Sequence, residues 1–594
     1  MNTAALLKYF PYERMRREQE AIMSTVYNAL SSKRDVLIEA ASGVGKTVAV
    51  LTATMPFIED GHKLVYIART HMELDKVVEE LVKINERGCS VRGVVFRGRS
   101  SLCINPMVAT LPSQLIDEFC SMLRGFNVCE YFVNSQKCII DVFNKKGEEL
   151  KRVCLRKGVC PYEALLSSMP NSDVIVMTYN YLIISELREK IFSLATHSSD
   201  KAPIIVLDEA HNIQEIVHSI NSVHLDFNDI IHAVSELEVV RPSRIINSFK
   251  DFIKNMINTS ETVRRGSVVP LDLTLSAEEL MSLKSLVNDA LHLNISKGET
   301  VIRGLLYLSA LLRLLGKVFE GNYVLLLRKE RDSLALEVFN PNPMGLKRLV
   351  KRRLSIIAMS ATLSPLDFYN KVLNMRSPLI KRIYSPYAKN ALFIVYTELD
   401  TSFKKRGKLL YTKTLSLIAD LDSYVPEEKS IAIFVPSYEF LEELIERGLV
   451  YKVGRKVITD SDLSTPDILD VADSLYVGVL GGRLSEGVDL RVSLCLIVGV
   501  PYSMPDYRLM RTLKEYSKIF PGRARRYAYV FPAIRRAIQA SGRLLRRPED
   551  RGIVIFADRR YLKLLKYFPK WMIPRIKVVK RRGELLKYVS LFSY

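Results

Sequence analysis

Residues 35 to 47 read Asp-Val-Leu-Ile-Glu-Ala-Ala-Ser-Gly-Val-Gly-Lys-Thr. An apolar strand is followed at once by a glycine-rich turn and a helix-compatible segment, which fits a phosphate-binding loop except that Ala40 replaces its first glycine. Gly43 and Gly45 let backbone N–H groups face a phosphate at the start of a helix. Lys46 adds a positive charge near the β- and γ-phosphates, and Thr47 can ligate Mg²⁺. A glycine-rich turn beside a surface lysine is the weaker alternative, so we predict a nucleoside triphosphate and Mg²⁺ site.

Short β-branched runs recur along the chain, and a turn and a helix-compatible stretch follow each of them. This is the pattern of parallel sheets with crossover helices. The first set of runs comprises Asp35–Glu39, Lys63–Ala68, Asp173–Met177, Pro203–Leu207 and Ser355–Met359. The second set comprises Ile431–Val435, Leu475–Leu480, Leu494–Val500 and Gly552–Ala557. We therefore predict an α/β fold with two parallel-sheet lobes.

Cysteines crowd into one part of the first lobe. Cys495 lies apart, and the other seven occupy one window: Cys89, Cys103, Cys120, Cys129, Cys138, Cys154 and Cys160. In a reducing compartment such crowding indicates a metal or iron–sulfur site, or else a chance group of buried thiols. The spacings lack the paired C-x-x-C knuckles of common zinc modules, which favours a site gathered from several helices.

A second insertion, from about residue 225 to 340, has helical periodicity. Ser276 and Glu279 form a capping box, and Gly304 to Phe319 reads as a leucine-rich buried helix. Two short runs, Tyr323–Arg328 and Ser333–Phe339, predict a hairpin. We expect both insertions and both lobes to pack as one body.

The chain carries 86 Lys and Arg against 65 Asp and Glu, a formal net charge of +21. A positive field of this size suits a polyanionic partner. We find no transmembrane segment and no secretion signal, so we expect a cytoplasmic protein without membrane contact.

Two acids follow the run that ends at Leu207. Ligands bind at the carboxyl ends of strands in open α/β sheets, so Asp208 is expected to hold Mg²⁺ through water. Glu209 is expected to orient or deprotonate an attacking water. Two acids after a strand can also be a simple helix cap, but together with a phosphate loop the catalytic interpretation is favoured.

The second lobe contains Gln539-Ala-Ser-Gly-Arg-Leu-Leu-Arg546. Arg543 and Arg546 lie three apart on one helix face and are candidates to stabilise transferred phosphate when the lobes close. The alternative is a solvated basic helix, since Arg535 and Arg536 are close neighbours.

These motifs, in this order, resemble superfamily 2 DNA helicases and, within them, the XPD family of iron–sulfur helicases. The segments that carry the resemblance are Phe10–Tyr12 with Gln19, Ala40–Thr47, Thr70–His71, Asp208–His211, Ser360–Thr362, Gly482–Asp489 and Gln539–Arg546. The resemblance implies ATP and Mg²⁺ as ligands, with Gln19 sensing adenine. Asp489 and Gln539 are further candidates at the nucleotide.

The resemblance also implies two RecA-like lobes, the first carrying a 4Fe-4S cluster insertion and a helical arch. The implied division is lobe 1 at 1–88, 166–224 and 343–385, the cluster domain at 89–165, the arch at 225–342 and lobe 2 at 386–594. The ligands chosen by local match are Cys103, Cys120, Cys129 and Cys160. Cys138 is the rival for the third ligand, while Cys89 and Cys154 are expected to be bystanders.

By the same resemblance, single-stranded DNA passes through a hole between the arch, the cluster domain and lobe 1. The residues implied to contact DNA are Thr70, His71, Arg97, Arg99 and Tyr179. The two arginines could instead be solvated surface, and Tyr179 could be core.

The implied function is a monomeric ATP-dependent DNA helicase that moves 5′ to 3′, acts on single-stranded and forked duplex DNA, and works with repair proteins, as in nucleotide excision repair. A DinG-type helicase, or a DNA-bound iron–sulfur redox sensor with incidental ATPase activity, are the alternatives.

Overall fold

The structure is a computed structural model. It describes residues 3–41, 43–183, 185–196, 200–219, 222–225, 227–240, 243–263, 267–296, 303–320, 323–329, 334–346, 353–384, 389–462, 473–486, 490–542, 544 and 550–593. None of the described helices has the length and apolarity needed to cross a membrane.

Lobe 1 contains a seven-stranded sheet in the order β11-β1-β10-β5-β2-β4-β3, and its strand pairs are parallel. The five predicted strands are confirmed: β1 (Val36–Ala40), β2 (Leu64–Ala68), β4 (Val174–Thr178), β5 (Ile204–Leu207) and β10 (Ser355–Ser360). Two edge strands were not predicted, β3 (Gly93–Phe96) and β11 (Leu379–Ile383). The first is only four residues long, and the second is half-exposed and charged, as edge strands often are. The helices of this lobe are α1 (Arg17–Ser31), α2 (Lys46–Glu59), α3 (His71–Asn85), α10 (Asn180–Ile183), α11 (Ser185–Thr196), α12 (Ile213–Ser219) and α17 (Leu366–Val372).

Lobe 2 contains a second seven-stranded sheet in the order β14-β15-β13-β16-β17-β12-β18, with parallel pairs throughout. The predicted strands are β13 (Ile431–Val435), β15 (Ser474–Val479), β16 (Leu494–Val498) and β17 (Gly552–Ala557). The additional strands are β12 (Ala391–Tyr396), β14 (Lys456–Thr459) and β18 (Ile576–Val579). The helices are α18 (Lys408–Tyr424), α19 (Tyr438–Glu446), α20 (Leu449–Lys452), α21 (Arg483–Glu486), α22 (Tyr507–Ile519), α23 (Phe531–Ser541), α24 (Tyr561–Leu564) and α25 (Arg582–Ser593). The predicted α/β class with two parallel-sheet lobes is confirmed.

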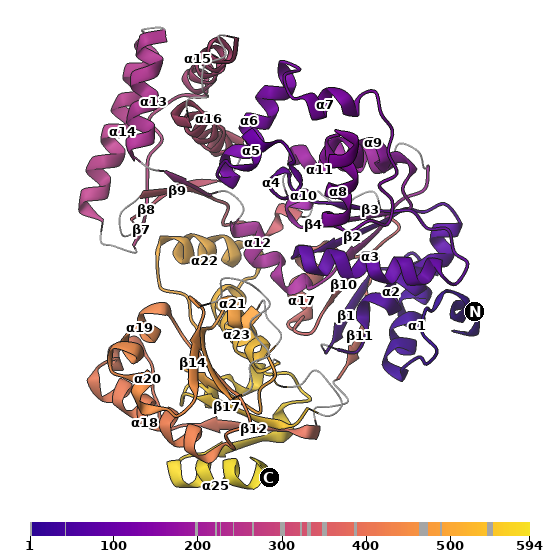
Figure 1. Cartoon of the computed structure of the whole chain (residues 1–594). Coiled ribbons are helices and arrows are strands. Elements are labelled where there is room, and N and C mark those ends of the chain that lie inside the picture. Colours follow the sequence, from indigo (N-terminus) through magenta and orange to yellow (C-terminus); the bar gives the residue numbers. More distant parts are fainter. Residues whose placement is uncertain are drawn as a thin grey trace.

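Two groups of helices lie outside the two sheets: the cysteine-rich group stands above the lobe 1 sheet, and the second insertion lies beside it at the upper left (Figure 1). The cysteine-rich window forms α4 (Arg99–Leu102), α5 (Pro106–Ala109), α6 (Ser113–Gly125), α7 (Glu130–Ser135), α8 (Gly147–Lys157) and α9 (Pro161–Ser168). The second insertion, for which we keep the name arch, forms α13 (Phe227–Val240), α14 (Arg244–Thr262), α15 (Ala277–Ser296) and α16 (Arg303–Gly316).

An antiparallel sheet closes the arch, in the order β6 (Ser222–Leu225), β9 (Leu334–Phe339), β8 (Val324–Lys329) and β7 (Val268–Pro270). The predicted hairpin is confirmed as β8 and β9, and its two flanking strands were not predicted. The capping box is also confirmed, because the Ser276 and Glu279 side chains each accept a hydrogen bond from the other residue's backbone N–H.

The cysteine-rich helices and the arch share one hydrophobic core. Leu115 and Phe119 of α6 are buried together with Phe249 of α14 and Leu308 and Leu311 of α16. Helix α6 is therefore held by the arch as well as by its own neighbours.

Helix α22 belongs to lobe 2 in sequence but lies against lobe 1 and the arch (Figure 1). The ring of Phe368 in α17 lies 6.0 Å from that of Tyr516 and 5.6 Å from those of Phe520 and Tyr527. This aromatic cluster joins the two lobes through apolar contact.

Three strands of lobe 1 are tied together at their starts by one fully buried carboxylate. Asp35 accepts hydrogen bonds from the Arg353 guanidinium at 2.8 Å, the Ile356 N–H at 2.8 Å and the Arg376 N–H at 2.5 Å. Since these partners precede or flank β10 and β11, Asp35 fixes the register of both strands against β1.

Replacing Asp35 by Ala should strongly destabilise lobe 1, because it removes the carboxylate that neutralises the buried Arg353 charge. Loss of one partner of a buried pair costs about 3–5 kcal/mol. Urea unfolding followed by circular dichroism should show the first transition at a lower urea concentration. Asp60→Ala, which removes an exposed partner of Lys201, is the matched control and should leave that transition in place. Equal midpoints for the two variants would contradict this role of Asp35.

Candidate active site

The phosphate loop joins β1 to α2. Gly43 and Gly45 adopt left-handed backbone conformations, with φ of 79° and 82°. A Cβ atom on Gly45 would lie 2.3 Å from the Gln19 amide nitrogen, so glycine is required there. Ala40, by contrast, is the last residue of β1 and keeps an extended strand conformation. Alanine in place of the first glycine is therefore compatible with the loop.

The charged group of Lys46 points back into its own loop. Its Nζ donates to the carbonyl oxygens of Ala40 at 3.0 Å and Ala41 at 3.3 Å, and it lies 4.0 Å from Glu209 Oε1. Thr47 follows directly in the first turn of α2. The lysine is thus held at the loop, close to an acid that follows β5, two strands away from β1 in the sheet.

Gln19 packs against the loop as part of α1. Its Oε1 accepts from the Arg16 N–H at 2.9 Å, and the Arg16 guanidinium donates to Gly43 O at 2.8 Å. The described contacts place Gln19 at the loop, and its role toward adenine stays a prediction.

Asp208 follows β5, and both its carboxylate oxygens and its backbone carbonyl accept hydrogen bonds. Its Oδ1 accepts from the Glu209 N–H at 2.9 Å, and its Oδ2 accepts from the Tyr66 hydroxyl at 2.7 Å. The Tyr179 hydroxyl donates to its backbone carbonyl at 2.7 Å. Burial raises the pKa of Asp208 to about 7, and the adjacent Glu209 contributes to that rise.

Glu209 occupies a left-handed conformation with φ of 46°, which is uncommon for a residue with a side chain. Its Oε2 accepts from Ser360 Oγ at 2.9 Å and lies 3.1 Å from His211 Nδ1. Burial opposes ionisation of Glu209, but Lys46, His211 and Ser360 outweigh it and hold the pKa of Glu209 below its ordinary value. Glu209 is therefore ionised at neutral pH.

The donor chemistry fits Mg²⁺. A carboxylate and a hydroxyl beside a phosphate loop are the oxygen ligands that this ion takes together with substrate phosphates and water. Asp208 and Thr47 are the side chains placed to hold it.

The segment after the acids, from His211 into α12, contacts lobe 2 directly. His211 Nε2 is hydrogen-bonded to the Gln539 side chain, while the Arg535 guanidinium donates to His211 O at 2.6 Å. Arg536 pairs with Glu215 at 3.0 Å. The alternative that Arg535 and Arg536 belong to a solvated basic helix is wrong, because both side chains make contacts between the lobes.

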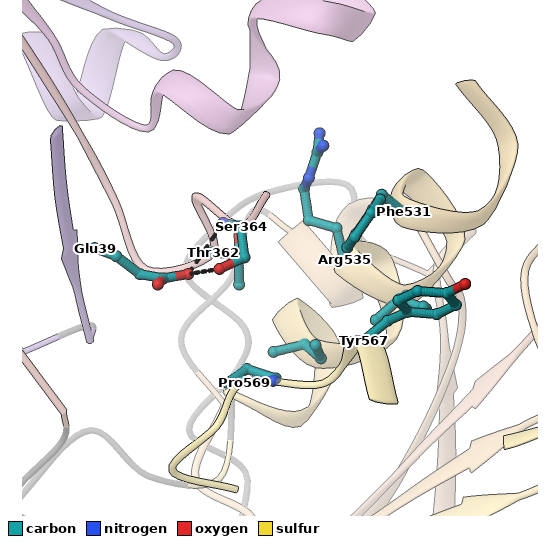
Figure 2. Close-up of a pocket in the computed structure, with 9 residues that line it drawn as sticks. Glu39, Thr362, Ser364, Phe531, Arg535, Tyr567 and Pro569 are labelled. Atoms are coloured by element: carbon teal, nitrogen blue, oxygen red, sulfur yellow. Dashed lines mark hydrogen bonds between the residues drawn. The ribbon is translucent and has the colours of Figure 1, made fainter. Parts of the chain in front are cut away.

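Figure 2 shows the same seam beside the end of β1, where Glu39, Thr362 and Ser364 of lobe 1 face Phe531, Arg535 and Tyr567 of lobe 2. The cavity between them measures about 20 Å³, which is room for about one water molecule. The lobes are thus almost in contact at this point.

Three predicted nucleotide residues, Arg543, Arg546 and Asp489, lie outside the described residues. Their approach to the phosphate loop stays a prediction.

The four chosen cysteines lie at or in four different helices. Cys103 ends α4, Cys120 lies in α6, and Cys129 and Cys160 precede α7 and α9. Burial raises the pKa of Cys103, and the nearby thiols of Cys120 and Cys129 add to the rise. Burial likewise raises the pKa of Cys160 to about 12, with a contribution from Cys120. The four thiols are therefore electrostatic neighbours.

The other cysteines of the window are placed differently. Cys138 is exposed, and Cys154 is fully buried in the lobe 1 core. Among the described residues, no three His, Cys, Asp or Glu side chains stand together as ligands of a single metal ion. The fit to an iron–sulfur cluster rests on donor chemistry, since thiolates are its usual ligands and four thiols lie at the ends or within neighbouring helices of one insertion.

A larger cavity of about 900 Å³ lies between lobe 1, the cysteine-rich helices and the arch. Its lining includes the cationic side chains of Arg69, Arg99, Arg124, Lys284 and Arg313, against the acids Asp117 and Glu118. A predominantly basic cavity of this kind suits a phosphate backbone.

Some of the predicted DNA contacts lie at this cavity. His71 is exposed at its wall, and the Arg99 guanidinium lies 3.9 Å from the Tyr162 ring centroid on the same lining. Thr70 is exposed beside it, although its hydroxyl also accepts from the Glu73 N–H and caps α3.

The structure corrects the expectation for Arg97 and Tyr179. The Arg97 guanidinium is buried in an ion pair with Asp75. Tyr179 borders the cavity but is 1% exposed, and its hydroxyl is used by Asp208. Both side chains are buried and bind neighbouring protein groups, so neither presents a surface to DNA.

Sequence reasoning gave no role to Tyr66, Ser360 or Arg535. A signal existed for Tyr66, since it is the one polar side chain in the apolar run 64–68 beside the strand that delivers the acids. For Arg535 no local signal separates a buried contact from a solvated one.

Comparison with known proteins matches both lobes. A family model described as DEAD_2 matches residues 66–230, and one described as a helicase C-terminal domain matches residues 421–575. The ATP-dependent DNA helicase XPD of Sulfolobus acidocaldarius is 25% identical, covering 93% of this chain and 97% of its own length. The general transcription and DNA repair factor IIH helicase subunit XPD/RAD3 of Saccharomyces cerevisiae is 23% identical, covering 95% of this chain and 88% of its own length.

Solved structures agree in fold. One described as an XPD helicase superimposes with a TM-score of 0.71 at 22% identity, covering 96% of this chain and 100% of that one. One described as apo XPD gives 0.64 at 20% identity, covering 94% and 99%.

Two parallel-sheet lobes, with a phosphate loop in the first and helicase models matching both, define a two-lobed superfamily 2 helicase. Within that class, these relatives, which match over nearly the whole chain, are XPD helicases, and a solved XPD structure shares the fold.

Replacing Gln539 by Ala should slow ATP hydrolysis about fivefold, because one hydrogen bond worth about 1 kcal/mol between lobe 2 and His211 is lost. The KM for ATP should change little, since Gln539 bonds to His211 and not to the phosphate loop. Steady-state kinetics with single-stranded DNA present measures both constants. Gln136→Ala, at an exposed position, is the control. An unchanged kcat in Gln539→Ala would show that this contact plays no part in turnover.

Proposed function

We propose that this chain is an ATP-dependent DNA helicase that moves along single-stranded DNA and unwinds duplexes. The observation that carries the proposal is the continuous set of contacts from the phosphate loop through Lys46, Glu209 and His211 to Gln539 of lobe 2. Such a set links the groups at a triphosphate to the position of the second lobe.

The residues of the site divide the chemistry between them. Backbone N–H groups around Gly43 and Gly45 cradle phosphate oxygens, and Lys46 exchanges its loop carbonyls for the β- and γ-phosphates. Glu209, held ionised by Lys46 and aimed by Ser360 and His211, orients the attacking water and accepts its proton. When bound between Asp208, Thr47 and the phosphates, Mg²⁺ would neutralise charge that develops on the leaving oxygens.

His211 connects lobe 2 to the residues that act on the triphosphate. One ring nitrogen faces Glu209 and Ser360 while the other meets Gln539. Arg543 and Arg546 are proposed to complete the site when the lobes close, and Asp489 to relay the nucleotide state to the strand-binding surface.

The proposed path of the single strand is the basic cavity of about 900 Å³. His71, Arg99 and Lys284 line it from lobe 1, the cysteine-rich helices and the arch respectively. Backbone contacts and stacking of this sort bind any sequence, which a translocating motor requires.

We further propose that Cys103, Cys120, Cys129 and Cys160 hold a 4Fe-4S cluster. Bound there, the cluster would tie α4, α6, α7 and α9 into one rigid body at the edge of the cavity. Forked duplex DNA would separate at that edge.

The remaining expectations are part of the same proposal: movement 5′ to 3′, action as a monomer in the cytoplasm, and cooperation with repair proteins as in nucleotide excision repair. The relatives of XPD type favour this function over a DinG-type helicase. Intact placement of Lys46 and Glu209 disfavours a redox scaffold with incidental ATPase activity. Strand displacement on substrates with 5′ or 3′ overhangs tests the direction, and equal activity on both would contradict it.

Lys46→Ala should reduce DNA-stimulated ATP hydrolysis by roughly two to three orders of magnitude, because a positive charge aimed at the transferred phosphate is removed. Binding of single-stranded DNA, measured by fluorescence anisotropy, should be nearly unchanged. Lys76→Ala, which removes an exposed lysine of the same lobe, serves as the control. Normal turnover in Lys46→Ala would refute the motor assignment.

Cys103→Ser should lose the visible iron–sulfur absorbance and the ability to unwind duplexes, because serine oxygen is a poor ligand for a site that prefers thiolate. ATP hydrolysis should survive better, since this cysteine lies away from the phosphate loop. Cys138→Ser, at the exposed rival position, should keep full iron content. Loss of iron in Cys138→Ser would instead transfer the third ligand position from Cys129 to Cys138.

A further inference from the structure

The hydroxyl group of Tyr66 lies at the proposed active site but takes no part in the proposed hydrolysis. Tyr66 lies in the middle of β2 and is fully buried, and it is the one polar side chain of that strand. Its hydroxyl donates to Asp208 Oδ2 at 2.7 Å. The phenol thus contacts one of the two side chains that are placed to hold Mg²⁺.

Counting donors and acceptors fixes the direction of this bond. A phenol has one hydrogen to donate, and an Asp208 carboxylate that is ionised beside Mg²⁺ can only accept. The single hydroxyl hydrogen of Tyr66 is therefore committed to Asp208 Oδ2.

The same bond orients Asp208. Its Oδ1 is held by the Glu209 N–H at 2.9 Å and its Oδ2 by Tyr66, so rotation of the carboxylate would break one of the two hydrogen bonds. In the buried site a broken bond would leave a polar atom unsatisfied, which is unfavourable. The remaining lone pairs of both oxygens then stay directed for water bound to a metal ion.

We propose that Tyr66 is a positioning residue for Mg²⁺, which holds the Asp208 carboxylate in a fixed orientation through its hydroxyl. This inference rests on the proposed nucleotide site and deepens it. Tyr66 itself touches neither the metal nor the nucleotide.

Tyr179 provides a matched control within the same site. It is also buried, and its hydroxyl also bonds to Asp208 at 2.7 Å, but the acceptor is the backbone carbonyl and not the carboxylate. Removing either hydroxyl deletes one buried hydrogen bond and keeps the ring. A purely structural role would therefore affect the two variants alike, whereas alignment of metal ligands predicts different effects.

The test measures binding of Mn²⁺, as a paramagnetic substitute for Mg²⁺, to the full chain with a non-hydrolysable ATP analogue, by electron paramagnetic resonance. Partners that orient metal ligands typically contribute 10- to 100-fold in affinity, so Tyr66→Phe should weaken Mn²⁺ binding by roughly 10-fold or more. Tyr179→Phe should stay within about threefold of the original chain. Binding of the analogue without metal should be the same for all three proteins, and millimolar Mg²⁺ should restore much of the kcat of Tyr66→Phe.

Three outcomes separate the ideas. Mn²⁺ affinity in Tyr66→Phe within twofold of the original chain, or an equal loss in both variants, overturns the role of Tyr66. If the original chain itself binds no metal with the analogue, the proposed nucleotide site fails first. Should Tyr66→Phe not fold, a crystal structure of the original chain with Mg²⁺ and the analogue decides, since the Tyr66 oxygen must remain hydrogen-bonded to Asp208.

Discussion

The structure depends on keeping one lysine and two acids together in a buried place before any nucleotide arrives. Lys46 begins α2, after the loop that follows β1, and Asp208 and Glu209 follow β5, with β10 between the two strands. Buried charges are unfavourable unless they are paired and hydrogen-bonded. The Glu209 N–H and the Tyr66 hydroxyl bind the Asp208 carboxylate, while Ser360 and His211 bind Glu209, which has a left-handed backbone conformation.

The two lobes are joined by two kinds of contact with different physical properties. The aromatic cluster of Phe368 with Tyr516, Phe520 and Tyr527 is apolar, and such contact is non-directional and tolerates small rotations. The bond between His211 and Gln539 is directional and is lost when the groups turn away. A change at Glu209 therefore acts on the directional contact first, while the apolar contact keeps the lobes associated.

The sequence predicted those parts of the fold that depend on local pattern. Buried strands such as 64–68 and 204–207 are apolar runs, and the phosphate loop has its own signature. Edge strands with mixed polarity, such as Leu379–Ile383, lack that signal. Contacts between side chains that are distant in sequence could not be predicted from local pattern either. Arg97 and Arg99 are two residues apart, yet the Arg97 side chain is buried in an ion pair with Asp75, while the Arg99 side chain lies over the Tyr162 ring at the cavity. Only the fold shows which of the two arginines faces the cavity.

The cysteine window shows how a site can be held by a neighbour that its own sequence does not indicate. Helix α6 carries Cys120, but Leu115 and Phe119 of the same helix are buried in the core of the arch. Glu118 accepts a hydrogen bond from Ser309 and pairs with Arg313, both in α16. Since Glu118, Ser309 and Arg313 also line the large cavity, the helix that carries a candidate ligand is at the same time part of the cavity wall. Any shift of α6 caused by the loss of a bound cluster must therefore change the shape of the cavity and the position of the arch together.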